Sequence, residues 1–337
     1  MLCRVAENLF WLSRYVERAV AVCRLVDVTW HLELDAGDPT HGDSFWAPLL
    51  GTPSEGAPQP VGVPRSPRDV RHFLAFDREN SSSLVSCIGC ARTAARGVRE
   101  SISSEMWEQL NVLYLSLSGS DLAVAAEAQP HEFYKRVMMG AQLFQGLAES
   151  NLARDEPWHF LCLGRYLERA DTVARVLNMQ AHLLTVGEGG RRDEAVRWLA
   201  VLRSCGSAEA YARYYSLRVD PARVVEFLLL NPIFPQSVRF CLGEAEGSLR
   251  EIARYEQSSA RNSSDGARTL GLLKARLEYA AVDEVIESGL QSFLEWVQAQ
   301  IAIVSDQLTL TYLRDEPQPG RLVAVSRAAM IMAAQQQ

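Results

Sequence analysis

The sequence lacks the features by which several classes of protein are recognised. It has no uninterrupted apolar run of about 18 residues, the length that crosses a bilayer, and Arg4 and Glu7 interrupt its N-terminal segment too early for a signal peptide. It also lacks the GxxxxGK[S/T] and GxGxxG patterns that cradle phosphate groups. We therefore predict a cytoplasmic protein that does not span a membrane and binds no nucleotide through these motifs.

Excess positive charge and metal-ligand patterns are absent as well. The formal net charge is −7, which argues against a general electrostatic attraction to nucleic acid or to anionic lipid. The six histidines are scattered, and none is spaced on a helix with another histidine or a glutamate as metal ligands are. The sequence predicts no nucleic-acid partner, no membrane partner, no metal site and no cofactor.

The seven cysteines do not resemble a disulfide framework, because their number is odd and they are scattered through apolar helical patterns. Cys87 and Cys90 form a CxxC motif, but no second CxxC and no nearby histidine completes a zinc set. Free cysteine is among the most buried residue types. We therefore predict reduced cysteines with a structural role.

The most informative feature that is present is an internal repeat. Residues 8–28 align without gaps with residues 159–179 at a shift of 151 residues, and residues 73–91 align with residues 227–245 at a shift of 154. Two blocks in the same order at nearly the same shift indicate a duplication. The identical pairs in the first block are Leu12/Leu163, Arg14/Arg165, Tyr15/Tyr166, Glu17/Glu168, Arg18/Arg169, Ala19/Ala170, Val22/Val173 and Arg24/Arg175.

Apolar residues recur at intervals of three and four, which predicts helices almost throughout and little or no sheet. In the first helix the apolar seam comprises Val5, Leu9, Leu12, Val16, Ala19, Cys23 and Val26. Further helices are predicted at 69–76, 83–104, 105–118, 131–150, 156–185, 192–203, 207–217, 221–230, 236–256, 265–283 and 285–313. The predicted fold is all-α, a helical bundle of two repeats related by a pseudo-twofold axis.

The repeat predicts the domain organisation. The first repeat covers residues 1–150 and contains an excursion rich in proline and glycine at residues 35–68. The second repeat covers residues 151–315, and residues 316–337 form a C-terminal extension. Ser83 and Ser237 precede apolar periodic runs, so we interpret both as helix N-caps rather than nucleophiles.

A charged turn stands in each repeat, RYVERA at residues 14–19 and RYLERA at residues 165–170. The charged side of the first helix also contains Phe10 and Leu25, so we expect it to be partly covered by other helices. Buried charges must be paired, because desolvating an isolated ion costs several kcal/mol. One interpretation is a network of ion pairs across the two helices, in which each glutamate meets an arginine of its own or of the other repeat.

A second interpretation is functional, because the arginines outnumber the glutamates and the guanidinium group suits carboxylate and phosphate ligands. Two glutamates in one cavity can also serve as acid and base when their surroundings separate their pKa values. The candidate ligand-binding residues are Arg14, Tyr15, Arg18, Arg165, Tyr166 and Arg169. The candidate catalytic residues are Glu17 and Glu168.

The segments RVAENLFWLSRYVERA, FLAFDRENSSSLVSCIGCARTAARGVRESISSEMWEQLNVLY and LGRYLERADTVARVL carry a resemblance to a known family. They closely resemble the bacterial alpha-E domain family, formerly catalogued as a domain of unknown function, and the resemblance extends from residue 1 to about residue 315. It implies an all-helical fold that shares the R-Y-x-E-R turn. Family members are typically encoded beside circularly permuted ATP-grasp proteins and transglutaminase-like peptidases.

This genomic association implies a part in making or processing peptide or amide bonds. The first hypothesis is a helical partner that docks with a circularly permuted ATP-grasp protein or supplies its acceptor site. The second is an enzyme that acts on a peptide or an activated carboxylate through Glu17 and Glu168. The third is a purely structural adaptor. A peptide or a carboxylate is the ligand that the arginine cluster would suit.

Overall fold

The computed structural model describes residues 1–36, 46, 49, 66–119, 122–186, 191–215, 218–255 and 265–313. Within these residues the chain is helical and has no strand, which confirms the all-α prediction. The helices are α1 (Cys3–Ala36), α3 (Pro67–Ala75), α4 (Leu84–Gly97), α5 (Ser104–Ser116), α6 (Leu122–Ala128), α7 (Pro130–Asn151), α8 (Glu156–Val186), α9 (Arg191–Ser204), α10 (Ala208–Tyr214), α11 (Pro221–Val225), α12 (Val238–Tyr255), α13 (Asp265–Glu278) and α14 (Val282–Leu308). Two π-helical turns, η2 (Glu226–Leu230) and η3 (Thr309–Leu313), continue α11 and α14.

Serine side chains cap several of these helices. The hydroxyl groups of Ser66, Ser83 and Ser103 each accept a hydrogen bond from the backbone N–H three residues further on. Ser237 does the same, accepting from the Phe240 N–H at 3.1 Å. Such a bond satisfies one of the free donors at a helix start and stabilises the helix by about 1 kcal/mol. The interpretation of Ser83 and Ser237 as N-caps is confirmed.

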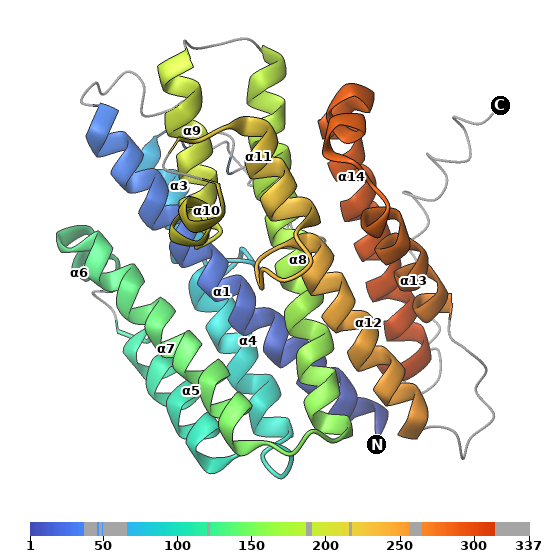
Figure 1. The fold of residues 1–337 in the computed structure, drawn as a ribbon. Helices are drawn as coiled ribbons and strands as arrows, with labels where there is room; N and C mark the ends of the chain where they lie inside the picture. The colour runs from blue at the N-terminus through green and yellow to red at the C-terminus, as the bar shows by residue number, and fades with distance from the viewer. Residues whose placement is uncertain are drawn as a thin grey trace.

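The helices α1 and α8 lie side by side at the centre of the bundle (Figure 1). The helices α4 and α7 pack on α1, while α12 and α14 pack on α8. Of the predicted α1 seam, Val5 is partly buried, and the other members are at most 1% exposed: Leu9, Leu12, Val16, Ala19, Cys23 and Val26. Burying each large aliphatic side chain contributes about 1.5–3 kcal/mol, so this seam is a main source of the stability of the bundle.

The two central helices approach each other closely at Gly164 of α8. A Cβ atom at this position would overlap the backbone carbonyl oxygen of Phe10 and the hydroxyl group of Ser13. Only glycine lets the two backbones come this close. The charged turns of both helices begin immediately after this point, so the contact at Gly164 determines how far apart they lie.

The structure corrects several predicted helix boundaries. The helix predicted at 83–104 ends at Gly97, because glycine is a weak helix former and Ser103 begins the next helix as an N-cap. The last predicted helix, 285–313, begins at residue 282, bends at Gly289, where φ is 106°, and finishes in η3. The short helix α6 was not predicted, because seven residues are too few to show a helical period.

Some predictions lie outside the described residues. These include most of the excursion at 35–68, although Trp46 and Leu49 are described and buried, and all of the extension at 316–337. The division into repeats at 1–150 and 151–315 stays a prediction. Among the helices that are described, none has the length and apolar character needed to cross a bilayer.

Candidate functional site

The carboxylate of Glu168 on α8 is held by two arginines of α1. Arg14 donates from Nε to Glu168 Oε2 at 2.7 Å, and Arg18 donates from both Nε and Nη2 to the same carboxylate. The Arg14 guanidinium also donates to the Ser305 hydroxyl at 3.2 Å and lies 4.9 Å from the centre of the Trp11 ring. Each of these contacts joins α1 to another helix or stacks the arginine on its own helix, and only 4% of the Arg14 side chain and 3% of the Glu168 side chain are exposed.

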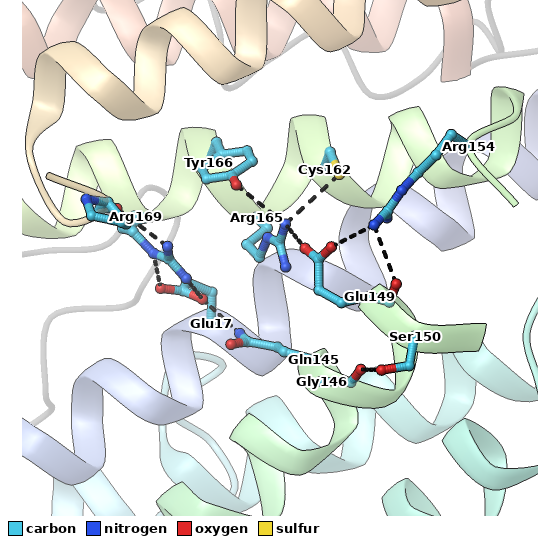
Figure 2. Close-up of polar contacts among 11 residues, drawn as sticks. Glu17, Gln145, Gly146, Glu149, Ser150, Arg154, Cys162, Arg165, Tyr166 and Arg169 are labelled. Carbon is cyan, nitrogen blue, oxygen red and sulfur yellow. Dashed lines mark hydrogen bonds and ion pairs between the residues drawn. The ribbon is translucent and has the colours of Figure 1, made fainter. Parts of the chain in front are cut away.

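The carboxylate of Glu17 on α1 has the reciprocal arrangement (Figure 2). Arg169 of α8 donates from Nε to Oε1 at 2.6 Å and from Nη2 to Oε2 at 3.0 Å. The side-chain amide of Gln145 on α7 donates to Oε2 at 2.7 Å. Arg169 is further anchored by the Pro235 carbonyl oxygen, which accepts from Nη1 at 3.3 Å. The predicted network of ion pairs between the two helices is therefore present.

Both glutamates are held in the ionised state. Burial alone would raise the pKa of Glu168, but Arg18 and Arg14 outweigh burial and lower the pKa to about 2. Burial acts in the same sense on Glu17, where Arg169 and Gln145 hold the pKa below its usual range. A general acid must be protonated at the working pH. Neither carboxylate has the raised pKa that a paired acid and base would need.

Arg165 does not pair with Glu17, although the repeat makes it the counterpart of Arg14. Figure 2 shows its guanidinium turned towards Glu149, whose Oε1 accepts from Nη2 at 2.8 Å. The same Nη2 lies 3.3 Å from the Tyr166 hydroxyl oxygen, which accepts from it. The buried Nε of Arg165 has no protein partner. A cavity of about 20 Å³ borders this side chain, which is room for a water molecule but not for an organic ligand.

The two tyrosines of the RYxER turns are partly buried and pack against aromatic rings. Tyr15 lies 5.6 Å from Trp11, and Tyr166 lies 6.1 Å from Phe240, measured between ring centres. Burial raises the pKa of both phenols, so both stay protonated at neutral pH. They contribute packing and, for Tyr166, one hydrogen-bond acceptor to the network.

The cavity that borders the Glu168 cluster is also small. Its volume is about 90 Å³, and Arg18, Glu168, Asp171 and Arg175 line it together with apolar residues of α1 and α8. Arg175 pairs within its own helix, donating from Nε to Asp171 Oδ2 at 2.7 Å. The charged turns are thus packed closely against the core, and a bound peptide would have to displace protein side chains.

The cysteines of the CxxC motif lie on α4 and are not bonded to each other. Cys87 is fully buried, and burial raises the pKa of its thiol to about 12. A thiol with so high a pKa is a poor nucleophile. The structural interpretation of Cys87 agrees with this environment, while Cys90 is exposed at the surface of the helix.

A larger cavity, which the sequence did not indicate, lies beside the other end of α1. Its volume is about 600 Å³, and its lining includes Arg24, Asp27, His31, Lys135 and Arg203. Asp27 and His31 stand one turn apart on α1, but an aspartate–histidine spacing is not among the His–His and His–Glu patterns that indicate a metal site in a helix, so the sequence did not reveal this pair. Arg24 and Arg175 occupy matching positions of the sequence repeat, but the repeat does not reveal that their surroundings differ. Arg24 lines this cavity, whereas Arg175 pairs with Asp171.

Comparison with known proteins identifies relatives over nearly the whole chain. The model of the Alpha-E family, described as a predicted alpha-helical domain with a conserved ER motif, matches residues 1–313. An uncharacterized protein of Mycobacterium bovis and one of Mycobacterium tuberculosis are each 26% identical over 342 residues. The alignments cover 92% of this chain and 37% of each relative, so the chain spans little more than a third of their length. No solved structure matches this chain.

Proposed function

The chain belongs to the Alpha-E family, and from that premise we propose that it is a helical partner subunit of an ATP-grasp protein in a system that forms peptide or amide bonds. The observation that carries this proposal is the closed Glu–Arg network. Glu17 and Glu168 each accept three hydrogen bonds from neighbouring side chains. The ER motif therefore serves to build the bundle, and the function of the bundle lies in what it binds.

The length of the relatives supports a role beside another protein. More than half of each mycobacterial relative lies outside the alignment, so the same domain occurs within longer chains. The sequence also lacks the GxxxxGK[S/T] and GxGxxG motifs that bind phosphate groups. This absence supports assigning the ATP-dependent step to the partner. We propose cytoplasmic localisation for the same reason, since that compartment supplies ATP.

We also propose that residues 1–150 and 151–315 are duplicated units of this partner. The reciprocal contacts support the idea, since Arg14 and Arg18 of the first unit meet Glu168, while Arg169 of the second meets Glu17. Symmetric interfaces make each contact twice in this manner. The duplication would give the bundle a central ion network that fixes how the two units pack.

The alternative hypothesis of an enzyme acting through Glu17 and Glu168 has less support. Both carboxylates are ionised and buried, and the cavities beside them are of about 20 and 90 Å³. A peptide or an activated carboxylate needs a pocket of several hundred Å³. The third hypothesis, a purely structural adaptor, differs from the partner hypothesis in that binding would leave the activity of the ATP-grasp protein unchanged.

The outer faces of α5 and α7 are suitable for contact with such a partner. These two helices pack together and lie on the opposite side of the bundle from α13 and α14 in Figure 1. Four of their large apolar side chains are more than half exposed: Val112, Leu115, Met139 and Leu143. Single exposed apolar residues are ordinary, but four on one helix pair favour this region as the docking face.

The experiment mixes the purified chain with the ATP-grasp protein of the same organism and measures the mass of the complex, its affinity and the ATP turnover. We expect a stable complex with changed turnover. The double variant Val112→Glu/Met139→Glu should weaken binding by about tenfold or more, because each charge would need desolvation at the interface. The matched control is Leu272→Glu, which places the same charge at an exposed leucine of α13.

Two results would count against this proposal. A chain that remains free in the mixture, with unchanged turnover by the ATP-grasp protein, would contradict the partnership itself. A complex that forms without any change in turnover would favour the structural adaptor. Equal weakening by Leu272→Glu would show that α5 and α7 are not the docking face.

A further inference from the structure

Three potential metal ligands meet where α1 lies against the start of α7. Asp27 and His31 are one helical turn apart on α1, and His131 is the second residue of α7. The chain offers one ligand atom from each of them, and these atoms all lie within 4.8 Å of one another. Residues 104 positions apart in the sequence are thus brought together by the packing of α1 on α7.

The separation of Asp27 and His131 already suits a shared ion. His131 Nδ1 is 3.0 Å from Asp27 Oδ1, a hydrogen-bonding distance at which Nδ1 carries the proton. A zinc ion would replace that proton, and two donors bound to one zinc ion at about 2.1 Å lie roughly 3.0–3.4 Å apart. The rings of His31 and His131 are perpendicular, with centres 5.2 Å apart. Close to half of each imidazole side chain is exposed, so small rotations that would complete the coordination meet no packed core.

The hydrogen bond of His31 determines which of its nitrogens can bind a metal. Its Nδ1 lies 2.8 Å from the backbone carbonyl oxygen of Asp27. A carbonyl oxygen only accepts hydrogen bonds, so Nδ1 must carry the proton, and in the neutral ring Nε2 then has the free electron pair. A backbone carbonyl that orients the second nitrogen is the usual support of a metal-binding histidine.

The cavity of about 600 Å³ beside Asp27 and His31 is lined by three basic side chains, Arg24, Lys135 and Arg203, while Glu209 adds one further acidic group. Arg24 lies against the backbone of Gly206, where a Cβ atom would be only 2.9 Å from its guanidinium carbon. Within the described part of the chain no carboxylate lies within ion-pair distance of Arg24. A partly buried arginine without an ion pair favours an anionic ligand.

We propose that Asp27, His31 and His131 bind a divalent transition metal ion of the zinc type, and that the ion and Arg24 together bind an oxyanion in the adjoining cavity. Two imidazole nitrogens and one carboxylate oxygen are a donor set that suits zinc. Three protein ligands leave at least one coordination position for an oxygen of the bound anion. This site is independent of the ER motif and of the proposed ATP-grasp partner.

The test measures Zn²⁺ binding by isothermal titration calorimetry on the full chain without a histidine tag. We expect one high-affinity equivalent in the wild type and an affinity at least about 100-fold lower in His31→Gln and in His131→Gln, since loss of even a supporting group costs about 10–100-fold. His72→Gln is the matched control, because His72 lies on α3 outside the cluster. Thermal unfolding should be unchanged in all three variants, because the side chains of His31 and His131 are half exposed and His72 is exposed.

The absorption spectrum of the Co²⁺-loaded chain identifies the ligands. Nitrogen and oxygen ligands give d–d bands without the sulfur-to-metal charge-transfer band that a thiolate adds. A charge-transfer band would place the ion at a cysteine such as Cys90 and overturn the assignment. The absence of saturable Zn²⁺ binding, or equal affinity in the wild type and both histidine variants, would overturn it as well.

The oxyanion is tested with inorganic phosphate and with acetate, titrated into the chain with and without Zn²⁺. We expect Zn²⁺ to raise the affinity for at least one of the two anions by about tenfold or more, and Arg24→Gln to remove that gain while Zn²⁺ affinity stays the same. The preferred anion distinguishes a phosphate ligand from a carboxylate ligand. Anion affinities that do not depend on Zn²⁺ would overturn this part of the proposal.

Discussion

Glu168 and Glu17 occupy matching positions of the sequence repeat, but their surroundings in the bundle differ. Glu168 receives hydrogen bonds from two arginines, Arg14 and Arg18. Glu17 receives them from one arginine and from the neutral amide of Gln145. A single guanidinium group and an amide are thus sufficient to hold a buried carboxylate, whereas the Glu168 cluster retains a surplus positive charge.

The difference shows what happens to an arginine that is no longer needed for the central ion pair. Arg165, which corresponds to Arg14, bonds instead to Glu149, whose side chain is 44% exposed. Its contact therefore resembles a surface ion pair, while the Arg14 contact is fully buried. Matching positions of the sequence repeat can thus carry the same residue type and differ in their role in the core.

The largest loss of stability is expected when the carboxylate of Glu168 or of Glu17 is replaced by an amide. Glu168→Gln should lower the free energy of unfolding by about 4 kcal/mol, because two buried arginines would lose their counter-charge. Glu17→Gln should cost about 3 kcal/mol, since Arg169 alone loses a charged partner and Gln145 can still donate to the new amide oxygen. Urea denaturation of both variants provides the measurement.

Glu149→Gln serves as the control for these variants, because the Glu149 side chain is 44% exposed and its pair with Arg165 should contribute less than about 1 kcal/mol. Equal losses in Glu168→Gln and Glu17→Gln would mean that the second arginine adds nothing to the Glu168 cluster. A loss below about 1 kcal/mol in both would contradict a structural role of the network.

Acid should weaken the protein through Glu168. Its pKa is about 2 in the folded chain and 4.5 in the reference state, so the unfolded chain takes up the proton first as the pH falls. The stabilisation is complete above about pH 4.5 and is lost as the pH falls towards about 2, a change of about 3 kcal/mol. The free energy of unfolding should therefore fall more steeply with acid in the wild type than in Glu168→Gln.

Urea unfolding at about pH 5 and about pH 3 measures this effect. The stability gap between the wild type and Glu168→Gln should narrow at the lower pH. If the stability gap is the same at both pH values, Glu168 takes up its proton at the same pH in the folded and in the unfolded chain. That result would contradict the lowered pKa of Glu168 in the folded chain.

The smallest losses of stability are expected when Arg14 and Arg165, which occupy matching positions of the repeat, are each replaced by lysine. Arg14→Lys should cost about 2 kcal/mol, because lysine cannot reproduce the planar set of donors that contacts Glu168 and Ser305. Arg165→Lys should cost less than about 1 kcal/mol, since its acidic partner is partly exposed. Thermal and urea unfolding of the two variants measure which substitution costs more stability. A larger loss in Arg165→Lys than in Arg14→Lys would contradict our interpretation of the two clusters.

The part of the structure that depends on residues within one helix was predictable from the sequence. The apolar seam of α1 follows from helical periodicity. The repeat offered the reciprocal contacts of Glu17 and Glu168 as one of two possible pairings, and only the packing of α1 on α8 decides between them. The contacts of Gln145 and Ser305 were not predictable, because these residues come from α7 and α14 and reach the network only through helix packing. His131 was missed as a neighbour of Asp27 for the same reason.

The absence of a side chain at Gly164 limits which sequences can form this bundle. Glu168 lies one turn beyond it on α8, about 6 Å along the helix axis, so the helix spacing at Gly164 decides whether the α1 arginines reach the carboxylate. An alanine there would push the helices apart at Phe10 and Ser13 and lengthen ion pairs that it does not touch. A residue without charge or side chain thus sets the spacing on which charges one turn away depend, and a side chain at position 164 would require a change in the packing of α1.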